Sequence, residues 1–566
     1  MRLLSSILFL SGGLHTTSAN NHHTPLDPYD ASVNTAPPAA AKRVAIIGAG
    51  AGGASTAYHL SQYAKASNIP LDITVYERNP YIGGRSTTVH AYNNTTFAKN
   101  TPVELGASIF VKINHILYNT SDVFNLTKIQ LGQAGGDDEE PESGPVLGVF
   151  DGDIFVFQQE AGTSWWKELA KLWWRYGLAP LKARNLMKEV TGGFQKMYQA
   201  PHFPFASLTD TLYNLGLLEV TNMTGAQFLK ERGVGELFSR EIIQASTRVN
   251  YAQNLGLIHG VEAMVCLATD GAMAIRGGNY RIFESMIDAS AKSVHLSTDV
   301  TDIDRHDDGT FTLTTKDALD TTSTGPTNTA SFDTIILAAP YQFASLSITP
   351  QPNHIPEEIP YVNLHVTLFT SPHILSPSAF KLKDTELVPS VVLTTLLEGE
   401  DPGKKPIGYA GKAGFFSIST LRRVTNPTTG EKEYLYKIFS PSAIPGAFLS
   451  KILGLATPAS GNEDPSTKDV SWIYRKLWQS YPYETPRASF EEVRLDENLW
   501  YTSGIESFVS TMETSSLMGA NVARLVVDEW LVRDGDAVGV GRGMESAGMT
   551  GFVDEAQVPL ELKAKL

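Results

Sequence analysis

Cysteine is almost missing from the sequence, since Cys266 is the single one among 566 residues. No intramolecular disulfide can form, so the fold must rely on its core, for which the chain is amply long. Inside the apolar segment EAMVCLA, Cys266 is predicted to be a small buried hydrophobe and not a nucleophile. No Cys and His residues stand at metal-ligand spacing, so we expect no metal site.

An excess of positive charge and long apolar runs are missing as well. The net charge is −15, which argues against a nucleic-acid partner. The N-terminal apolar run, Leu3–Leu10, is too short to cross a bilayer. Because Arg2 precedes this run and the small pair Ser18–Ala19 follows it, residues 1–19 have the order of a secretory signal peptide. A disordered leader is the alternative interpretation.

Five asparagines are followed two residues later by Ser or Thr with no intervening proline, which makes them candidate glycosylation sites. They are Asn93, Asn94, Asn119, Asn125 and Asn222. Together with the N-terminal segment they predict a glycoprotein of the secretory pathway, destined for the extracellular space or for a vacuole or lysosome.

The stretch RVAIIGAGAGGASTAYHLSQY, residues 43–63, places three glycines between a buried type of strand and a helix. Gly48 permits the tight turn, Gly50 lets backbone amides approach a pyrophosphate, and Gly53 allows the helix to pack closely on the strand. Glu77 ends the next strand and is placed to bond ribose hydroxyls, while its charge disfavours the 2′-phosphate of NADP. The unit predicts a dinucleotide site.

The segment ERNPYIGGRSTTV follows, and its Gly83-Gly84-Arg85-Ser86 resembles the GG-R motif of the amine oxidase and phytoene desaturase flavoproteins. The resemblance implies FAD, with Arg85 as a fixed cation near the pyrophosphate or the flavin edge. VELGASIF, residues 103–110, is similar to the next segment of that family, which approaches the isoalloxazine. A surface ion pair and an ordinary strand are the structural alternatives for these two segments.

Residues 499–530 are predicted to form a strand, a turn and a helix that begins near Ser510. In this superfamily such a helix directs its N-terminus at the flavin, where its dipole stabilises negative charge. Glu506, in the turn, is alternatively a surface residue or a helix-entry cap. The predicted cofactor-binding residues are Gly48, Gly50, Gly53, Glu77, Arg78, Gly84, Arg85, Gly106, Ala107, Ser108, Val300, Gly504, Glu506, Thr511, Met512 and Glu513.

Several further segments resemble the prenylcysteine oxidase (prenylcysteine lyase) family, over roughly residues 43–535. They are LWWRYG (172–177), RVNYAQN (248–254), AIRGGNYRIFESMI (274–287), YPYETP (481–486) and YTSGIESFVSTMETSSL (501–517). The resemblance implies an FAD-dependent thioether oxidase. Such an enzyme removes a hydride from the allylic carbon bonded to sulfur; water adds, and a thiol, a prenyl aldehyde and, from O2, hydrogen peroxide are released. No Cys or His adjoins these motifs, so FAD is expected to be non-covalent.

The catalytic side chains stay unassigned, because the cofactor carries this chemistry. Arg248, Asn250, Tyr251 and Gln253 are candidates for lining the amino-acid end of the site or the flavin, although Arg248 could equally hold a structural carboxylate. The tryptophans at 165, 166, 173 and 174 either pack against the protein or form a lipid-facing entry helix, which would give a peripheral membrane contact.

Three rival functions stay open: a flavin amine oxidase, an oxidase of another small-molecule thioether, and a secreted FAD-binding protein without turnover. Amine oxidases often use a lysine near flavin N5, and the sequence places none there. The predicted fold is α/β, a Rossmann-type FAD-binding domain of the glutathione reductase or amine oxidase kind with an inserted mixed α+β substrate domain.

The predicted order along the chain alternates between these two domains, and polar stretches such as 318–330 are predicted to be loops. It comprises a signal peptide (1–19), a disordered lead-in (20–41), FAD-binding parts (42–130, 293–345 and 491–535), substrate-domain parts (131–292, mainly helical, and 346–490) and a C-terminal tail (536–566).

Overall fold

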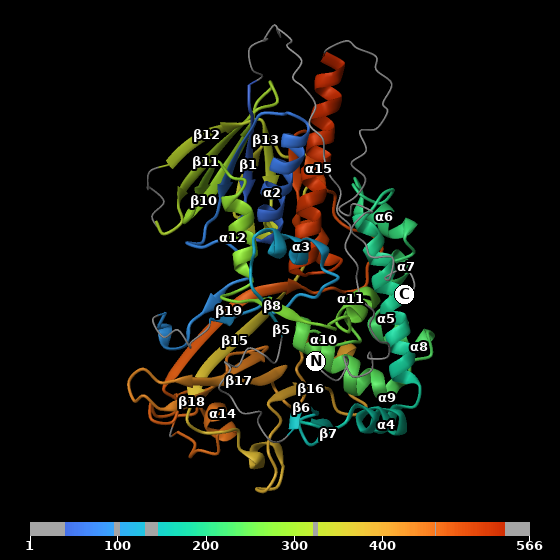
Figure 1. Cartoon of the computed structure of the whole chain (residues 1–566), viewed down its shortest axis with the longest axis vertical. Coiled ribbons are helices and arrows are strands. Elements are labelled where there is room, and N and C mark those ends of the chain that lie inside the picture. Colours follow the sequence, from blue (N-terminus) through green and yellow to red (C-terminus); the bar gives the residue numbers. More distant parts are fainter. Residues whose placement is uncertain (1–39, 96–101, 131–144, 321–326, 459, 538–566) are drawn as a thin grey trace, which may run out of the picture.

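A computed structural model shows two lobes stacked along the long axis of the molecule (Figure 1). The residues described are 40–95, 102–130, 145–320, 327–458 and 460–537. The predicted signal peptide, nearly all of the lead-in and nearly all of the C-terminal tail lie outside these ranges. Among the described helices, none is both long enough and apolar enough to cross a bilayer.

The upper lobe is built on a six-stranded, mostly parallel sheet with the order β20-β21-β13-β1-β2-β9. Its central strands carry short apolar runs that are buried on both faces, as parallel strands covered on both sides require. Segments far apart in the sequence therefore share one sheet. Its strands are β1 (Lys42–Ile47), β2 (Leu71–Tyr76), β9 (Ser293–His295), β13 (Thr334–Leu337), β20 (Arg494–Asp496) and β21 (Leu499–Tyr501).

One face of this sheet is covered by helices and the other by a second, four-stranded sheet (Figure 1). The helices are α2 (Ala51–Ala66), α12 (Tyr280–Asp288) and α15 (Met512–Ala537). The second sheet contains β10 (Thr298–Arg305), β11 (Phe311–Asp317), β12 (Thr327–Phe332) and β14 (Ser347–Thr349). The predicted loop at 318–330 is wrong at its end, because β12 begins inside it. This edge strand is polar and largely exposed, so it lacks the apolar alternation that identifies a strand in a sequence.

Helices α2 and α15 touch backbone to backbone through small residues. A Cβ on Gly519 would lie 2.3 Å from the carbonyl oxygen of Gly52. The Ser55 hydroxyl donates a hydrogen bond of 2.6 Å to the carbonyl of Ser516. This close contact fixes the start of α15 relative to the glycine-rich turn before α2.

The lower lobe is built on a seven-stranded sheet with the order β19-β15-β18-β17-β16-β6-β7. One of its faces packs on a separate apolar core, and the opposite face is turned to the upper lobe. Its strands are β6 (Pro145–Phe150), β7 (Phe155–Glu160), β15 (Tyr361–Ser371), β16 (Val391–Thr394), β17 (Ser417–Thr425), β18 (Lys432–Ser440) and β19 (Trp472–Pro482).

Most of the remaining helices lie along one side of the lower lobe (Figure 1). Two helices lie elsewhere: α3 (His115–Val123) packs on α15, and α14 (Gly446–Ile452) lies near β18 (Figure 1). The other helices and the two turns used below are α4 (Trp165–Tyr176), α5 (Ala179–Gln195), α6 (Leu208–Asn214), α7 (Leu218–Thr221), α8 (Gly225–Glu231), α9 (Glu236–Phe238), the π-helical turn η3 (Ser239–Ile243), α10 (Gln244–Tyr251), α11 (Gly260–Val265), α13 (Tyr341–Ala344) and the 3₁₀ turn η6 (Ser503–Ser507). Two-stranded ladders are formed by β3 (Thr88–Val89) with β4 (Val103–Glu104) and by β5 (Lys128–Gln130) with β8 (Met273–Ile275). The α/β class and the inserted mixed lobe are as predicted.

A buried carboxylate on α15 joins the helices of both lobes. Glu513 accepts hydrogen bonds from the amides of Ile116 (2.9 Å) and Leu117 (3.0 Å) at the start of α3. It also accepts one from the Tyr198 hydroxyl at 2.9 Å. The carboxylate therefore satisfies amides that the first turn of α3 cannot pair internally.

We expect Glu513→Ala to destabilise the protein severely. The change leaves two amides and one buried hydroxyl without partners, at about 1–3 kcal/mol for each group. The free energy of unfolding, measured by denaturant titration, should fall by about 3 kcal/mol or more. A loss below about 1 kcal/mol would show that water replaces the carboxylate.

The Glu513→Gln variant tests the pH dependence of the same contact. Burial raises the pKa of Glu513 from 4.5 to about 7. The folded state then keeps a proton that the unfolded state has already lost between these values, so this group's stabilisation is full at low pH and is lost as pH rises through about 7. Glutamine cannot ionise, so the variant should show a flatter decline in unfolding free energy between about pH 5 and about pH 8. Identical pH slopes in both proteins would contradict this assignment.

Candidate active site

The glycine-rich turn between β1 and α2, with the first residues of α2, contains Gly48, Gly50 and Gly53, and only at Gly50 would an added Cβ have room. Gly48 has φ +109°, a conformation that favours glycine. A Cβ on Gly53 would lie 1.9 Å from the carbonyl oxygen of Gly48, so this glycine is required by helix packing. A Cβ on Gly50 would meet nothing closer than the Cα of Gly84 at 3.9 Å. Packing within the protein therefore does not explain Gly50, whereas the approach of a ligand to its backbone does.

The GG-R segment lies opposite this turn. Gly84 has φ +58°, and a Cβ on it would lie 3.2 Å from the Cα of Gly50. Two glycines from separate loops thus face each other at the N-terminus of α2, where amides and the helix dipole favour a pyrophosphate. The residues present fit a dinucleotide.

Glu77 follows β2 at the same sheet edge. It is buried, and its carboxylate accepts hydrogen bonds from the amides of Ala49 (2.9 Å) and Asn79 (2.8 Å). Glu77 therefore also fixes the glycine-rich turn. The neighbouring Arg78 is exposed and donates to the carbonyl of Phe343 at 2.7 Å. Val300, on β10, is packed into the core between the two sheets of the upper lobe.

Arg85 forms an ion pair at 2.6 Å with the buried carboxylate of Glu506, in the turn before α15. Arg85 also donates to the carbonyl of Ser480 at 2.9 Å, and the Tyr361 hydroxyl donates to Glu506 at 3.1 Å. Burial alone would lower the pKa of Arg85, but the Glu506 carboxylate outweighs burial and raises it. About a third of the Arg85 side chain stays accessible, so it can face a ligand while its charge is paired. Gly504 lies in the same turn and lines a small pocket.

The start of α15 reaches the GG-R segment. The Ser86 hydroxyl lies 3.4 Å from the sulfur of Met512. The Thr511 amide donates to the Thr514 hydroxyl at 3.0 Å, and the Thr514 amide donates back to the Thr511 hydroxyl at the same distance. Three residues of this segment were predicted to bind the cofactor. The amide of Thr511 is already engaged within the helix cap, and the amides of Met512 and Glu513 belong to the first turn of α15.

The segment from Gly106 to Ser108 lies between the two lobes. A Cβ on Gly106 would be 2.9 Å from the ring of Trp478. The Ser108 hydroxyl donates to the Gly106 carbonyl at 2.7 Å, and the Ala107 carbonyl accepts from the Asn279 amide group at 2.9 Å. The backbone that was predicted to approach the isoalloxazine thus passes close over the lower sheet.

A lysine of that sheet reaches the same segment. Lys437 is buried on β18, and its Nζ donates to the Glu104 carbonyl at 2.6 Å and lies 3.4 Å from the Ser108 hydroxyl. Burial lowers the pKa of Lys437 to about 8, against the opposing effect of Glu104. Burial also raises the pKa of Glu104 to about 7. Near neutral pH, therefore, the Lys437 amine and the Glu104 carboxyl can each gain or lose a proton.

Lys437 was missed in the sequence. The signal was present in EYLYKIFS, because strand alternation puts Lys437 on the same face as Leu435 and Phe439. A lysine on an apolar face is costly to bury and therefore indicates a specific role. The sequence did not show which lobe that face meets, so no role followed.

The RVNYAQN segment forms the end of α10 and the following loop. Arg248 is fully buried and donates to the Thr394 hydroxyl (3.1 Å), to Asn254 (3.1 Å) and to the Ala410 carbonyl (2.6 Å). Burial lowers its pKa to about 9, and its direct acceptors among the described residues are all uncharged. Arg248 therefore joins α10 to the lower sheet and its loops, and the structural carboxylate considered as its partner is not in direct contact.

Of the other three polar residues of this segment, Asn250 and Gln253 bond the backbone of the protein, and Tyr251 packs against another ring. Asn250 donates back to the Ser246 carbonyl at 2.9 Å. Gln253 donates to the Pro482 carbonyl (3.0 Å) and accepts from the amide of Glu484 (2.9 Å), so it fixes the YPYETP loop. Tyr251 packs against the ring of Tyr481 at a centroid distance of 5.1 Å.

Tyr251 borders a buried pair of carboxyl groups, Glu262 and Glu484, neither of which has an exposed surface. Burial raises the pKa of both, and their mutual repulsion raises that of Glu484 further. Glu484 accepts from the Ser510 amide just before α15 at 3.1 Å. At least one of the two carboxyls is thus neutral near pH 7.

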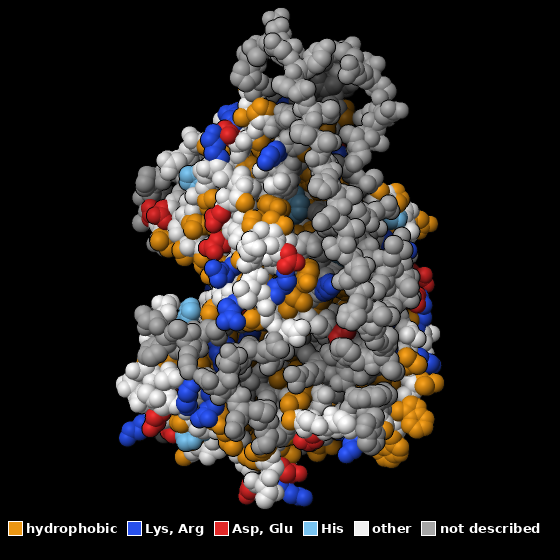
Figure 2. Space-filling view, viewed as in Figure 1, with side chains coloured by type: hydrophobic (Ala, Val, Ile, Leu, Met, Phe, Trp, Pro, Cys, Tyr) orange, Lys and Arg blue, Asp and Glu red, His pale blue; other side chains and the backbone are white. Residues whose placement is uncertain are grey.

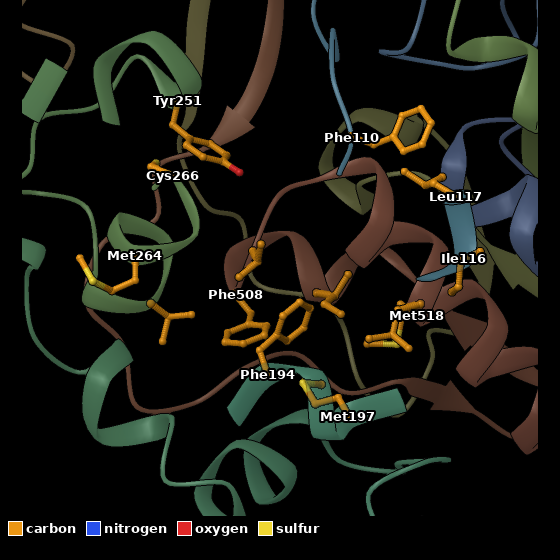
Figure 3. Close-up of a cluster of buried hydrophobic side chains, with 14 of the residues drawn as sticks. Phe110, Ile116, Leu117, Phe194, Met197, Tyr251, Met264, Cys266, Phe508 and Met518 are labelled. Atoms are coloured by element: carbon orange, nitrogen blue, oxygen red, sulfur yellow. The ribbon is translucent and has the colours of Figure 1, made fainter. Parts of the chain in front are cut away.

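Apolar side chains from both lobes surround this region. In Figure 3, Tyr251 and Cys266 lie on one side and Phe110, Ile116 and Leu117 on the other, with the ring of Phe508 between them. Cys266 is buried as predicted, and burial raises its pKa well above the ordinary value. Within the described ranges, no three His, Cys, Asp or Glu side chains gather as a metal centre.

Comparisons with known proteins agree with this geometry. Residues 46–124 match the model of an NAD(P)-binding Rossmann-like domain. Cyclohexylamine oxidase from Brevibacterium oxydans IH-35A superposes with a TM-score of 0.50 at 15% identity, over 87% of this chain and 100% of that one. Wild-type putrescine oxidase superposes equally well at 11% identity, over 86% and 99% of the two chains. These likenesses establish the fold, a Rossmann-type dinucleotide-binding lobe joined to a mixed α+β lobe.

The family follows from the sequence comparisons. Residues 158–538 match the model of the prenylcysteine lyase family, and the chain belongs to that family. Farnesylcysteine lyase of Arabidopsis thaliana is 26% identical over 507 residues, covering 87% of this chain and 89% of its own. Prenylcysteine oxidase 1 of Homo sapiens is 26% identical over 500 residues, covering 86% and 89%.

Gly50 and Gly84, which face each other at the N-terminus of α2, are called the glycine cradle below. Substitutions at Gly50 and at Gly53 give a matched test of this cradle. Gly50→Ala should fold normally, because the new methyl group meets no protein atom closer than 3.9 Å. It should weaken cofactor retention at least about tenfold, because the methyl group stands where the pyrophosphate approaches. Gly53→Ala should instead prevent folding through its clash with Gly48. Flavin content per protein and the thermal midpoint of the apoprotein distinguish these results; normal flavin content in Gly50→Ala would remove the cradle from the cofactor site.

Proposed function

We propose that this chain is an FAD-dependent oxidase that cleaves the thioether of a prenylcysteine-type substrate. The substrate, O2 and water would give a free thiol (cysteine), a prenyl aldehyde and hydrogen peroxide. The observation that carries the proposal is the family match over residues 158–538, on a chain whose glycine cradle fits a dinucleotide. The names of the Arabidopsis and human relatives supply the substrate class.

The proposed FAD would be held non-covalently by parts of the chain that the fold brings together. Gly50 and Gly84 would border its pyrophosphate, Glu77 would bond the adenosine ribose at the sheet edge, and Arg85, paired with Glu506, would present its guanidinium to it. When bound, the flavin supplies a two-electron acceptor that O2 regenerates.

The protein residues would orient the thioether and keep the reaction dry. Apolar side chains around Phe110, Tyr251 and Phe508 suit an isoprenoid chain. After hydride loss at the carbon next to sulfur, an attacking water must lose a proton. Lys437, beside Ser108 and with a pKa near neutrality, is suited to hold or accept that proton at Nζ.

Lys437 also bears on the rival amine oxidase function. A buried lysine is present near the proposed flavin segment after all, but it lies on β18 with its amine bonded to the Glu104 carbonyl. The solved amine oxidases resemble this chain at 15% identity or less and share only its fold, whereas the family match spans the substrate lobe. The prenylcysteine function is therefore favoured.

We propose further that the chain enters the secretory pathway and is glycosylated. Support comes from the N-terminal segment and from the sequons, because Asn93, Asn119, Asn125 and Asn222 are exposed and Asn94 is half-buried.

Substrate oxidation is tested with a panel of thioethers and a polyamine. Farnesylcysteine should yield aldehyde, thiol and peroxide in equal amounts. S-(hexahydrofarnesyl)cysteine, the saturated analogue, should bind comparably through the same apolar contacts yet react far more slowly, because its carbon lacks allylic stabilisation of positive charge. Thiol release without aldehyde and peroxide would contradict the oxidase proposal, and turnover of the polyamine alone would favour an amine oxidase.

Lys437→Met tests the proton-acceptor role. We expect kcat for farnesylcysteine to fall roughly 100-fold, the usual scale for a lost general base. Because the wild-type amine is neutral only above its pKa of about 8, activity should rise with pH through that value. The variant should lose this rise. Lys432→Met, an exposed lysine on the same strand, is the control and should behave as wild type. An unchanged kcat and pH profile in Lys437→Met would exclude the role.

A further inference from the structure

Helix α4 and the start of α5 expose large apolar side chains in a group that the proposed chemistry does not use. Trp173 is 64% exposed, Trp174 86%, Leu178 59% and Leu181 48%. These four residues are called the tryptophan patch below. Figure 2 shows hydrophobic side chains gathered at the edge of the lower lobe where Figure 1 places α4. Exposed tryptophans at this density mark an interaction surface on most proteins.

The patch is held rigidly on the protein. Arg175 donates two hydrogen bonds to Glu241 on η3, at 2.8 and 2.7 Å, and the Tyr176 hydroxyl donates a third at 2.8 Å. Leu172 and Tyr176 are buried beneath the helix. The indoles thus stand on an anchored helix and are not the side chains of a loose loop.

The charge around the patch is opposite to that of the whole protein. Residues 165–188 contain six basic residues and one acidic residue, a net charge of +5, whereas the full chain carries −15. The basic residues are Lys167, Lys171, Arg175, Lys182, Arg184 and Lys188. A basic rim around exposed tryptophans is the pattern of a surface that meets anionic headgroups.

The same charge argues against a second copy of this chain on the patch. A two-fold dimer through it would set the exposed lysines of the two copies against each other, with repulsion between them. Arg175 does not add to this charge, because Glu241 pairs with it. Tryptophan is also the residue enriched where protein meets the membrane interface, because its ring is apolar and its N–H is polar.

We propose that the tryptophan patch docks the lower lobe onto the surface of an anionic phospholipid bilayer, without spanning it. The indoles and leucines enter the headgroup boundary, and the lysines contact the phosphates. This interaction goes beyond the proposed reaction and does not depend on it. It favours the lipid-facing alternative for Trp173 and Trp174 over packing against the protein, whereas the side chains of Trp165 and Trp166 lie outside the described part of the structure.

Vesicle flotation with the full-length flavoprotein tests the docking without any turnover. The probe is unilamellar vesicles of phosphatidylcholine with 30% phosphatidylserine, compared with phosphatidylcholine alone. We expect wild type to float with the anionic vesicles, and the double variant Trp173→Ser/Trp174→Ser to bind them at least about tenfold more weakly. Tyr213→Ser, which removes another aromatic side chain that is 73% exposed on α6, is the matched control and should bind as wild type.

A charge variant and a spectroscopic measurement cover the case in which the tryptophan variant folds poorly. Lys182→Glu/Lys188→Glu should weaken binding to the anionic vesicles while flavin content and thermal midpoint stay unchanged. Brominated lipids should quench part of the wild-type tryptophan fluorescence. Absence of flotation by wild type, equal flotation of the folded double serine variant, or a dimer that this variant abolishes would each overturn the proposal.

Discussion

The ion pair between Arg85 and Glu506 is the contact on which the site depends. Through it and its partners, the GG-R loop is joined to the turn before α15, to the end of β19 and to Tyr361 at the start of β15. Removing Arg85 would leave the buried Glu506 carboxylate without its charged partner, at a cost on the order of 3 kcal/mol, the low end for buried pairs because Arg85 is partly exposed. The pair therefore fixes the upper lobe against the lower sheet. In the proposed function, both of these parts of the protein contact the same ligand.

This junction explains why so many titratable groups are buried close together. Once the lobes are fixed, the lower sheet presents Lys437 to the segment Glu104–Ser108, and the YPYETP loop presents Glu484 to the amide of Ser510, two residues before α15. Each group is held by backbone contacts and shielded from water, which lowers the pKa of Lys437 to about 8 and raises the pKa of Glu484 well above its ordinary value. A dry, apolar site with proton carriers near neutrality is what oxidation of a thioether requires from the protein, since the cofactor supplies the redox chemistry.

The sequence predicted what rests on local backbone geometry. Gly48 and Gly53 are where turn and helix packing require them, and the parallel strands around β1 follow from short apolar runs. Features that depend on tertiary partners escaped prediction. Arg248 appeared to be a site candidate because its polarity was visible and its uncharged acceptors at 394, 410 and 415 were not. Lys437 had no role until β18 was placed, and the exposure of Trp174 could not be read from its spacing.

The central claim is that a flavin held by this cradle takes electrons from a prenyl thioether. The most direct measurement mixes the oxidised holoprotein with farnesylcysteine in the absence of O2 and follows the visible flavin band. The account predicts that the band bleaches in a single turnover, that deuterium at the carbon next to sulfur slows the bleaching, and that admitting air restores the band with release of peroxide. A band that persists while free thiol appears would contradict the account, because cleavage would then proceed without oxidation.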